Sequence, residues 1–229
     1  MSADGRYITF TTAATNVLPP NGGLALHDTC FAAPAGCAPS NRNLFVGYNG
    51  GPPQGASESF WVLSANARYS GFNSLAASSL VPGVPNEPTA AFVYDSCIGG
   101  PAGCIPRNDE ASLTFNGGLP DNGSGTAVSS NDGNHVVFLS IADNVLSYAY
   151  RSSSMYVRLT CANAAPGCIP TTYLLSVDSN TGIQGNSQYS DYPAITPDGH
   201  YAVFVSTAAN WPGPLQSNGN TQVWLARVF

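Results

Sequence analysis

The sequence contains little charge. Of its 229 residues, 7 are arginine, none is lysine and 13 are Asp or Glu, so the formal net charge is −6. Charged residues make up 9% of the chain, against about 25% in an ordinary soluble domain. Binding to duplex nucleic acid depends on basic side chains that neutralise phosphates. An acidic chain without lysine is therefore not expected to bind nucleic acid.

The sequence also lacks long apolar segments. No run approaches the roughly 20 apolar residues of a membrane helix, so no membrane span is expected. No apolar period typical of a helix is sustained over about 12 residues. Hydrophobic residues still make up 43% of the chain and aromatic residues 10%, which is enough for a buried core and argues against disorder. With 24 Gly and 18 Pro besides, the composition favours an all-β protein.

The six cysteines form three pairs with the same spacing, each with six residues between its two cysteines: Cys30 and Cys37, Cys97 and Cys104, Cys161 and Cys168. Three copies of one spacing predict three local disulfides. Zinc is a weaker alternative, because zinc-binding cysteines usually lie two to four residues apart and no matching histidines are present. Free thiols are the remaining alternative. Disulfides persist outside the reducing cytosol, so we expect an extracytoplasmic protein that is secreted, periplasmic or at the cell surface.

One phrase of the form Ser-x-Asp-Gly-x-Tyr-x-x-Phe organises the chain. It occurs four times, at 2–10, 64–72, 130–138 and 196–204, with substitutions in each copy. Its last residues, Phe10, Phe72, Phe138 and Phe204, are 62, 66 and 66 residues apart. We therefore expect a single domain, 1–229, built from four repeats at approximately 1–59, 60–125, 126–191 and 192–229, the last of them truncated.

Each repeat divides into four short predicted strands. The first strands precede the turn, at Phe60–Ser64, Thr126–Ser130 and Pro193–Thr196. The second strands follow the turn, at Tyr7–Thr12, Tyr69–Ser74, His135–Ser140 and Tyr201–Ser206. The third strands begin at Leu24, Ala91, Met155 and Val223. The fourth strands follow the cysteine pairs, at Asn43–Tyr48, Ala111–Phe115 and Thr171–Val177. Asp-Gly favours a tight hairpin. The second repeat has Asn66-Ala67 instead, so its turn is expected to be strained or of another type.

Four-stranded units with a period of sixty-odd residues predict a β-propeller. The repeated phrase resembles the TolB-type, WD40-like propeller repeat known as PD40, over essentially the whole chain. The resemblance implies a bacterial propeller that binds other proteins or flanks a catalytic domain. We expect about four four-stranded blades, incomplete at both termini. Either the chain is part of a larger ring, or its open sheet edges pair with another chain.

Candidate catalytic groups are few. The histidines are His27, His135 and His200, and no Gly-x-Ser-x-Gly motif frames a serine nucleophile. Asp4, Asp132 and Asp198 recur at the Asp-Gly turn, where an Asp is a turn former; the alternative is a ring of acids that binds cations. We therefore expect no catalytic residue, no cofactor and no metal.

The three tryptophans differ in their expected environment. Trp61 and Trp224 lie within predicted strands and are expected in the core, whereas Trp211 lies in a loop, Asn210–Pro214. If it is exposed, Trp211 is the best candidate for contact with a partner or ligand. The function that this sequence favours is a non-enzymatic protein-interaction or structural assembly module. The alternatives are a carbohydrate-binding, lectin-like propeller, which would bind a glycan, and an accessory domain of a secreted hydrolase.

Overall fold

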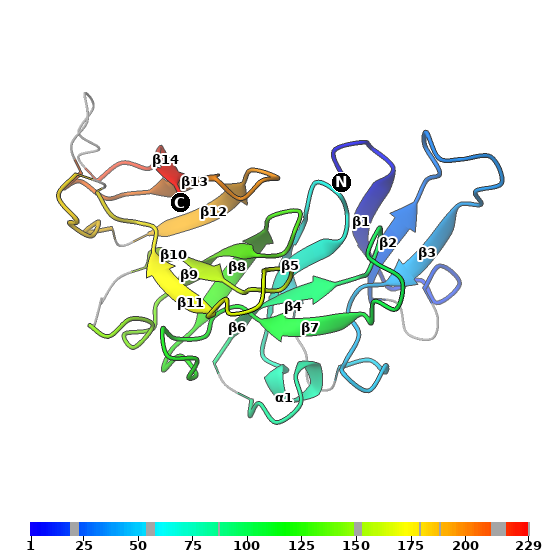
Figure 1. Cartoon of the computed structure of the whole chain (residues 1–229), viewed down its shortest axis with the longest axis horizontal. Coiled ribbons are helices and arrows are strands. Elements are labelled where there is room, and N and C mark those ends of the chain that lie inside the picture. Colours follow the sequence, from blue (N-terminus) through cyan, green and yellow to red (C-terminus); the bar gives the residue numbers. More distant parts are fainter. Residues whose placement is uncertain are drawn as a thin grey trace.

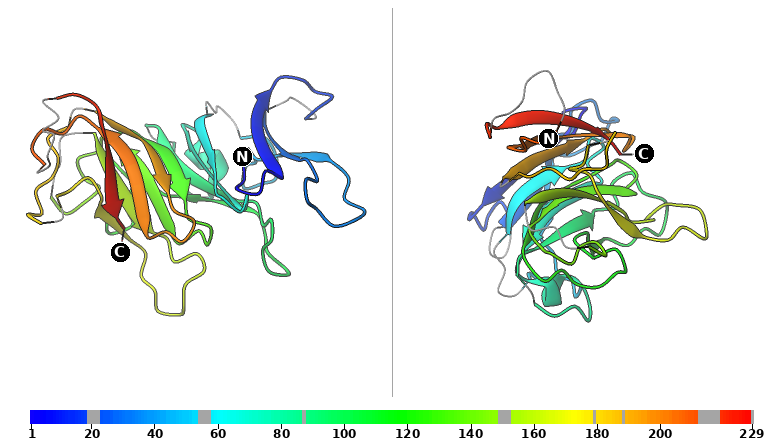
Figure 2. Two further views of the ribbon diagram at one scale, coloured as in Figure 1. Left: turned by 90° about the horizontal axis from the view of Figure 1, so that it is seen from above. Right: turned by 90° about the vertical axis from the view of Figure 1, so that its left-hand side faces the viewer.

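The structure is a computed structural model that describes residues 1–18, 23–53, 58–86, 88–148, 153–178, 180–187, 189–211 and 219–228. Its strands form four antiparallel sheets of three, four, four and three strands. The sheets follow one another in chain order along an arc that is open between the first and the fourth (Figure 1). Seen from above, the blue first sheet and the orange-red fourth sheet lie at opposite ends of the row (Figure 2). The chain is an open, all-β propeller, as the repeats predict.

We number the sheets as blades in chain order. Blade 1 consists of β1 (Tyr7–Thr12), β2 (Gly23–Asp28) and β3 (Ser40–Asn43). Blade 2 consists of β4 (Glu58–Leu63), β5 (Tyr69–Ser74), β6 (Ala90–Asp95) and β7 (Arg107–Glu110). Blade 3 consists of β8 (Ser124–Ser129), β9 (His135–Ser140), β10 (Ser154–Leu159) and β11 (Thr171–Leu174). Blade 4 consists of β12 (Ser190–Ile195), β13 (Tyr201–Ser206) and β14 (Gln222–Arg227).

A single turn of helix, α1 (Ala77–Leu80), follows β5 and was not expected. Its Ala77 and Leu80 are buried in the core between blades 1 and 2. In the described part of the chain, no helix is long and apolar enough to cross a membrane.

The strands after the turn, β1, β5, β9 and β13, have the bounds that the sequence predicts. The preceding turn positions them, because its fourth residue is in the left-handed region, with φ of +75° at Gly5 and Gly133 and +77° at Gly199. In blade 2 this residue is Ala67, at φ +63°, and its amide donates to Ser64 as the glycines donate to their own first turn residue. Of the two expected alternatives, the first therefore holds, because the turn keeps its type and places a non-glycine residue in the left-handed region.

The predicted fourth strands of the first two repeats are wrong. They were expected at Asn43–Tyr48 and Ala111–Phe115, but the structure has β3 and β7, which lie earlier and are polar. These strands form the outer edge of their blades, where one side of the strand is open. The apolar residues that follow, such as Leu44 and Ala111, lie beyond the end of the strand, where their amides still bond to the neighbouring strand and their side chains are buried in the core. Those apolar residues belong to the core and not to the strand that was predicted there.

The first strands β4, β8 and β12 begin two or three residues before the predicted positions. Each contains a register shift relative to its neighbour, as between Gly125 and Val128 in β8. A bulge of this kind bends the strand and increases its twist. These strands also lie next to one another from blade to blade, so they line the inner side of the arc.

The core consists of three clusters, one between each pair of adjacent blades. Between blades 1 and 2, Trp61 stacks on Phe72 with ring centroids 4.1 Å apart. Between blades 2 and 3, Gly71 lies so close to Ala127 that a Cβ atom would fall 2.0 Å from the Ala127 carbonyl oxygen. Each blade therefore buries its faces mainly against its neighbours, as stacked repeats require.

Candidate functional site

The recurring aspartates form hydrogen bonds within their turns. Asp4 accepts bonds from the Ser2 hydroxyl and the Arg6 amide, and Asp132 and Asp198 accept the corresponding bonds in blades 3 and 4. Asn66 takes the same place in blade 2, accepting from the Ser64 hydroxyl. The bond from Ser2 lowers the pKa of Asp4. These contacts support the interpretation of the carboxylates as turn formers.

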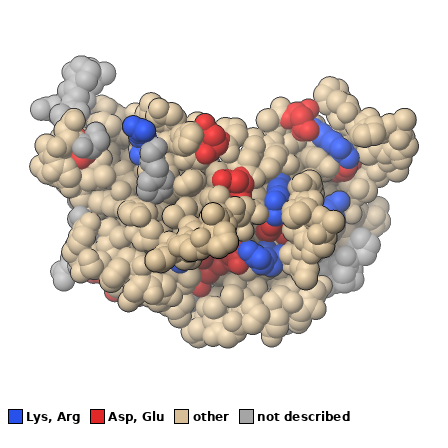
Figure 3. Space-filling model, in the orientation of Figure 1, with Lys and Arg blue, Asp and Glu red and all other residues tan. Residues whose placement is uncertain are grey.

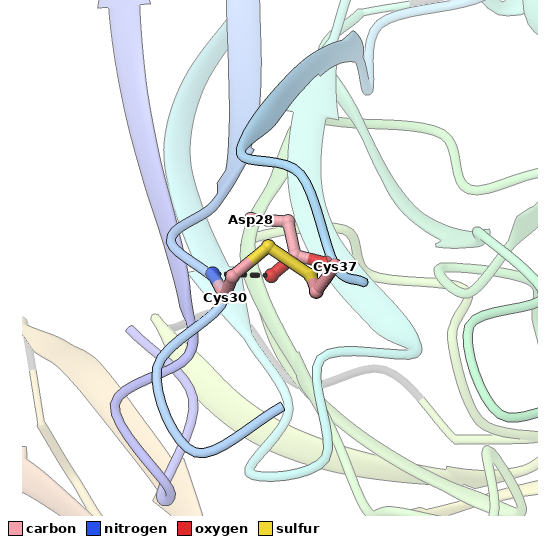
Figure 4. A group of neighbouring side chains, drawn as sticks. All are labelled: Asp28, Cys30 and Cys37. Atoms are coloured by element: carbon pink, nitrogen blue, oxygen red, sulfur yellow. Dashed lines mark hydrogen bonds between the residues drawn. A yellow bond between two sulfur atoms is a disulfide. The ribbon is translucent and has the colours of Figure 1, made fainter. Parts of the chain in front are cut away.

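The cysteine loops are closed by disulfides between Cys30 and Cys37, Cys97 and Cys104, and Cys161 and Cys168, the pairing that the spacing predicts. Around the first, the Asp28 carboxylate and both sulfurs lie within 4.8 Å of one another (Figure 4). This arrangement resembles a metal site. However, sulfurs joined in a disulfide are not thiolates, and the thiolate is the form of cysteine that binds a metal.

The Asp28 carboxylate already has partners. It accepts two bonds from the Arg6 guanidinium, at 2.8 and 2.7 Å, and one from the Cys30 amide at 2.9 Å. The bonds from Arg6 lower its pKa to about 2. In blade 2, Arg68 and Asp95 form the same bidentate pair beside the second disulfide. These groups anchor the cysteine loops to the sheets.

The third loop is anchored differently. Asn134 and Leu159 stand where blades 1 and 2 have the Arg and the Asp, so both members of the ion pair are replaced together. The Asn163 amide donates to the Asn134 side chain at 3.0 Å, and the Asn163 side chain donates to the Tyr69 hydroxyl at 2.8 Å. Tyr69 belongs to blade 2, so this loop also ties two blades together.

The histidines lie on different parts of the arc. His27 Nδ1 lies 2.8 Å from Asn41 Oδ1 on the outer strands of blade 1. His200 contacts the Asp198 carboxylate at 3.1 Å on an exposed turn of blade 4. His135 is half-buried and packs against Gly199, where a Cβ atom would lie 2.6 Å from its Nδ1. His135 thus has the packing position that Tyr69 has one blade earlier.

Trp211 is buried, so the condition under which it was the best candidate for contact with a partner or ligand, exposure in its loop, is not met. Its exposed fraction is 6%, its ring packs edge-on against Trp224 with centroids 4.7 Å apart, and its indole N–H donates to Ile183. The remainder of the loop, 212–214, lies outside the described residues. Trp61 and Trp224 pack against the core clusters, as expected.

A pocket of about 460 Å³ lies between blades 3 and 4, and Trp211 forms part of its wall. Blade 3 contributes residues around the end of β11, including Leu174 and Val177. Blade 4 contributes much of β14, including Trp224 and Leu225. The pocket therefore follows the outer edge of β14.

The outward face of blade 4 is the feature that the sequence analysis missed. Val203, Val223 and Leu225 correspond in the repeat to Val137, Met155 and Val157 of blade 3. The three blade 3 residues are at most 1% exposed, because blade 4 covers them. The three blade 4 residues are 37%, 72% and 69% exposed. An alignment of the repeats with one another would have identified them as core positions.

The sequence matches no protein-family model and no curated protein. Among solved structures, a putative TolB from Agrobacterium tumefaciens is 15% identical, with a TM-score of 0.45 over 99% of this chain and 65% of that one. A puromycin-hydrolyzing peptidase from Mycobacterium tuberculosis is 12% identical, with a TM-score of 0.39 over 97% of this chain and 29% of that one. The chain thus spans less than two thirds of the length of either structure.

Proposed function

We propose that this protein is a non-enzymatic, extracytoplasmic propeller that acts as a protein-interaction and assembly module, with residues 1–229 forming one unit. The observation that supports this most is the outward face of blade 4. Its Val223 and Leu225 occupy positions that every preceding blade buries against a neighbour, and its Val203 occupies the position of the buried Val137 in blade 3. Contiguous apolar surface of this kind marks interaction sites in soluble proteins.

The chemistry of this face suits a second protein. Burial of a Val or Leu side chain stabilises a contact by roughly 1.5–3 kcal/mol. The chain as a whole has 9% charged residues, so few charges have to lose their hydration when two surfaces meet. Figure 3 shows the same character, because uncharged side chains cover most of the face drawn and the charged ones form a few groups.

The remaining parts of the proposal have separate support. The three disulfides favour an oxidising compartment outside the cytoplasm. His27 and His200 each contact a residue of their own blade, Asn41 and the aspartate of an exposed turn. Open sheet edges in blades 1 and 4 favour contact with a second protein molecule, including another copy of this chain.

Light scattering over a range of protein concentrations tests the assembly role. We expect the wild-type chain to self-associate and the double variant V223S/L225S to be monomeric. The matched control is I105S/I169S, which removes two isoleucines that are each 78% exposed and directly follow the second cysteine of a disulfide loop. A wild-type chain that stays monomeric at high concentration, or equal association of all three proteins, would contradict the proposal.

A further inference from the structure

The outer edge of β14 differs from the corresponding edge of the other blades. In blades 1, 2 and 3 a short fourth-position strand, β3, β7 or β11, pairs with the third one. In the described part of blade 4, no strand pairs with this edge of β14. The pocket of about 460 Å³ lies along it, lined on this side by Trp224, Leu225, Ala226, Arg227 and Val228. The pocket therefore occupies the place of an outer strand.

The other blades define how an outer strand would pair there. In blade 3, β11 pairs antiparallel with β10, so that Thr171 lies opposite Leu159 and Leu174 lies opposite Tyr156. Blade 2 has the same register between β6 and β7. In β14 the matching residues are Arg227 and Trp224, because Trp224 pairs with Phe204 as Tyr156 pairs with Phe138. The first residue of a four-residue outer strand would thus lie opposite Arg227, and its fourth residue would lie opposite Trp224.

The second residue of the outer strand makes a repeated contact with the preceding blade. In blade 2 the Asn108 side chain donates to the Val46 carbonyl at 2.7 Å. In blade 3 the Thr172 hydroxyl donates to the Leu113 carbonyl at 2.8 Å. Both donors are buried. The residue equivalent to Val46 and Leu113 is Val177, and it lines the pocket beside β14.

The two residues after the outer strand also make repeated contacts. In blade 3 the Leu175 amide donates to the Met155 carbonyl at 2.8 Å, and the Met155 amide donates to the Ser176 hydroxyl at 3.1 Å. Blade 2 has the same two contacts among Ala91, Ala111 and Ser112. The residue of β14 equivalent to Met155 is Val223. The outward carbonyl of Val223 is therefore placed to accept from the amide of an apolar residue, and its outward amide is placed to donate to the hydroxyl of a serine that follows that residue.

We propose that the outer edge of β14 binds an extended segment of a second polypeptide by strand addition. The segment runs antiparallel to β14. It carries Asn or Thr at its second position, an apolar residue at its fifth position and serine at its sixth position. Its second side chain donates to the Val177 carbonyl, and its fourth side chain enters the pocket beside Trp211 and Trp224. The inference rests on the proposed interaction role and names the kind of partner that this role requires.

The β11 sequence itself, Thr-Thr-Tyr-Leu-Leu-Ser (171–176), is the natural probe, because it carries every feature of this pattern. A synthetic peptide of this sequence would be titrated into the whole chain while tryptophan fluorescence is recorded. Two of the three tryptophans, Trp211 and Trp224, line the pocket, so we expect a saturable change in emission. A peptide with Thr172→Val keeps the shape but lacks the donor, and should bind about 5- to 10-fold more weakly. A peptide with Leu174→Asp and a scrambled peptide should not saturate.

A variant of the chain tests the edge. Backbone groups alternate in direction along a strand, so the amide of Leu225 points outward like that of Val223. Leu225→Pro removes this outward donor and leaves the bonds to β13, because proline is tolerated on edge strands in that position. We expect the variant to keep its far-UV circular dichroism and to lose peptide binding. Equal binding by the variant, or binding of the β11 peptide no tighter than that of the scrambled one, would overturn the inference.

The result separates this inference from the proposed function. If the chain self-associates through Val223 and Leu225 but does not bind the β11 peptide, strand addition is wrong and the interaction role is retained. If the peptide binds to a chain that remains monomeric, strand addition is supported and the assembly role is wrong.

Discussion

The ring of Tyr69 in blade 2 packs against Gly133 in the turn of blade 3, so closely that a Cβ atom on Gly133 would lie 2.5 Å from the Tyr69 Cζ. His135 packs on Gly199 in the same way one blade later. In blades 3 and 4, the turn before the second strand therefore also packs against a side chain of the preceding blade. Local turn chemistry and contact between blades depend on the same residue.

Gly133→Ala should be more destabilising than a change of backbone conformation alone explains. Its φ of +75° disfavours alanine by roughly 1 kcal/mol, and the clash with Tyr69 adds about 1–3 kcal/mol. Gly167→Ala is the matched control, because Gly167 has φ +95° and a Cβ atom there would have no neighbouring atom within 4 Å. Urea unfolding measures both losses. Equal losses would show that Tyr69 moves away freely.

Gly71→Ala should open the contact between blades 2 and 3. The new methyl group would fall 2.0 Å from the Ala127 carbonyl oxygen, and the backbone of β8 would have to move. We expect a loss of about 3 kcal/mol or more in the free energy of unfolding. Gly125→Ala, also in a strand and with its nearest contact at 3.5 Å, should change stability by less than about 1 kcal/mol. A Gly71→Ala protein of wild-type stability would contradict this account of the interface.

Stability should fall in acid through Asp28. Arg6 lowers its folded-state pKa to about 2, below the value of about 3.9 in an unfolded chain. The ion pair therefore contributes its full stabilisation above about pH 5, and this contribution is lost progressively as the pH falls towards 2. Asp28→Asn should remove this part of the acid dependence, as measured by urea unfolding at pH 7 and pH 3.

The control for Asp28 is Asp109→Asn. Asp109 also pairs with an arginine, but both side chains are at least half exposed, and such pairs contribute little. We expect its acid dependence to equal that of the wild type. An Asp28→Asn protein with the same pH dependence as Asp109→Asn would refute the role assigned to the Arg6 pair.

Replacement of Cys161 and Cys168 by serine should cost about 2.5 kcal/mol, because the bridge closes a loop of roughly eight residues in the unfolded chain. Thermal or urea unfolding of the double variant measures the loss. Peptide mapping of the unreduced wild type by mass spectrometry should find all three local pairs. Links between cysteines of different loops, or six free thiols, would contradict the assignment.

The sequence by itself determined the units from which this protein is built. The repeated turns, Asp-Gly in blades 1, 3 and 4 and Asn66-Ala67 in blade 2, define the starts of β1, β5, β9 and β13, because each turn places a residue in the left-handed region just before the strand. The repeated cysteine spacing defines the loops, because both partners lie close along the chain. Information of this kind is local, so the residues themselves carry it.

Burial was decided by the tertiary structure. Met155 and Val223 are apolar residues at the same position of the same strand, yet one is buried and the other is 72% exposed. The difference arises because blade 4 covers Met155, while in the described structure no blade covers Val223. Trp211 is the reverse case, since packing against Phe204 and Trp224 buries a residue that its Pro- and Gly-rich surroundings place on the surface. Whether an apolar side chain is core or contact surface depends on what lies opposite it in space, and a local sequence pattern does not contain that information.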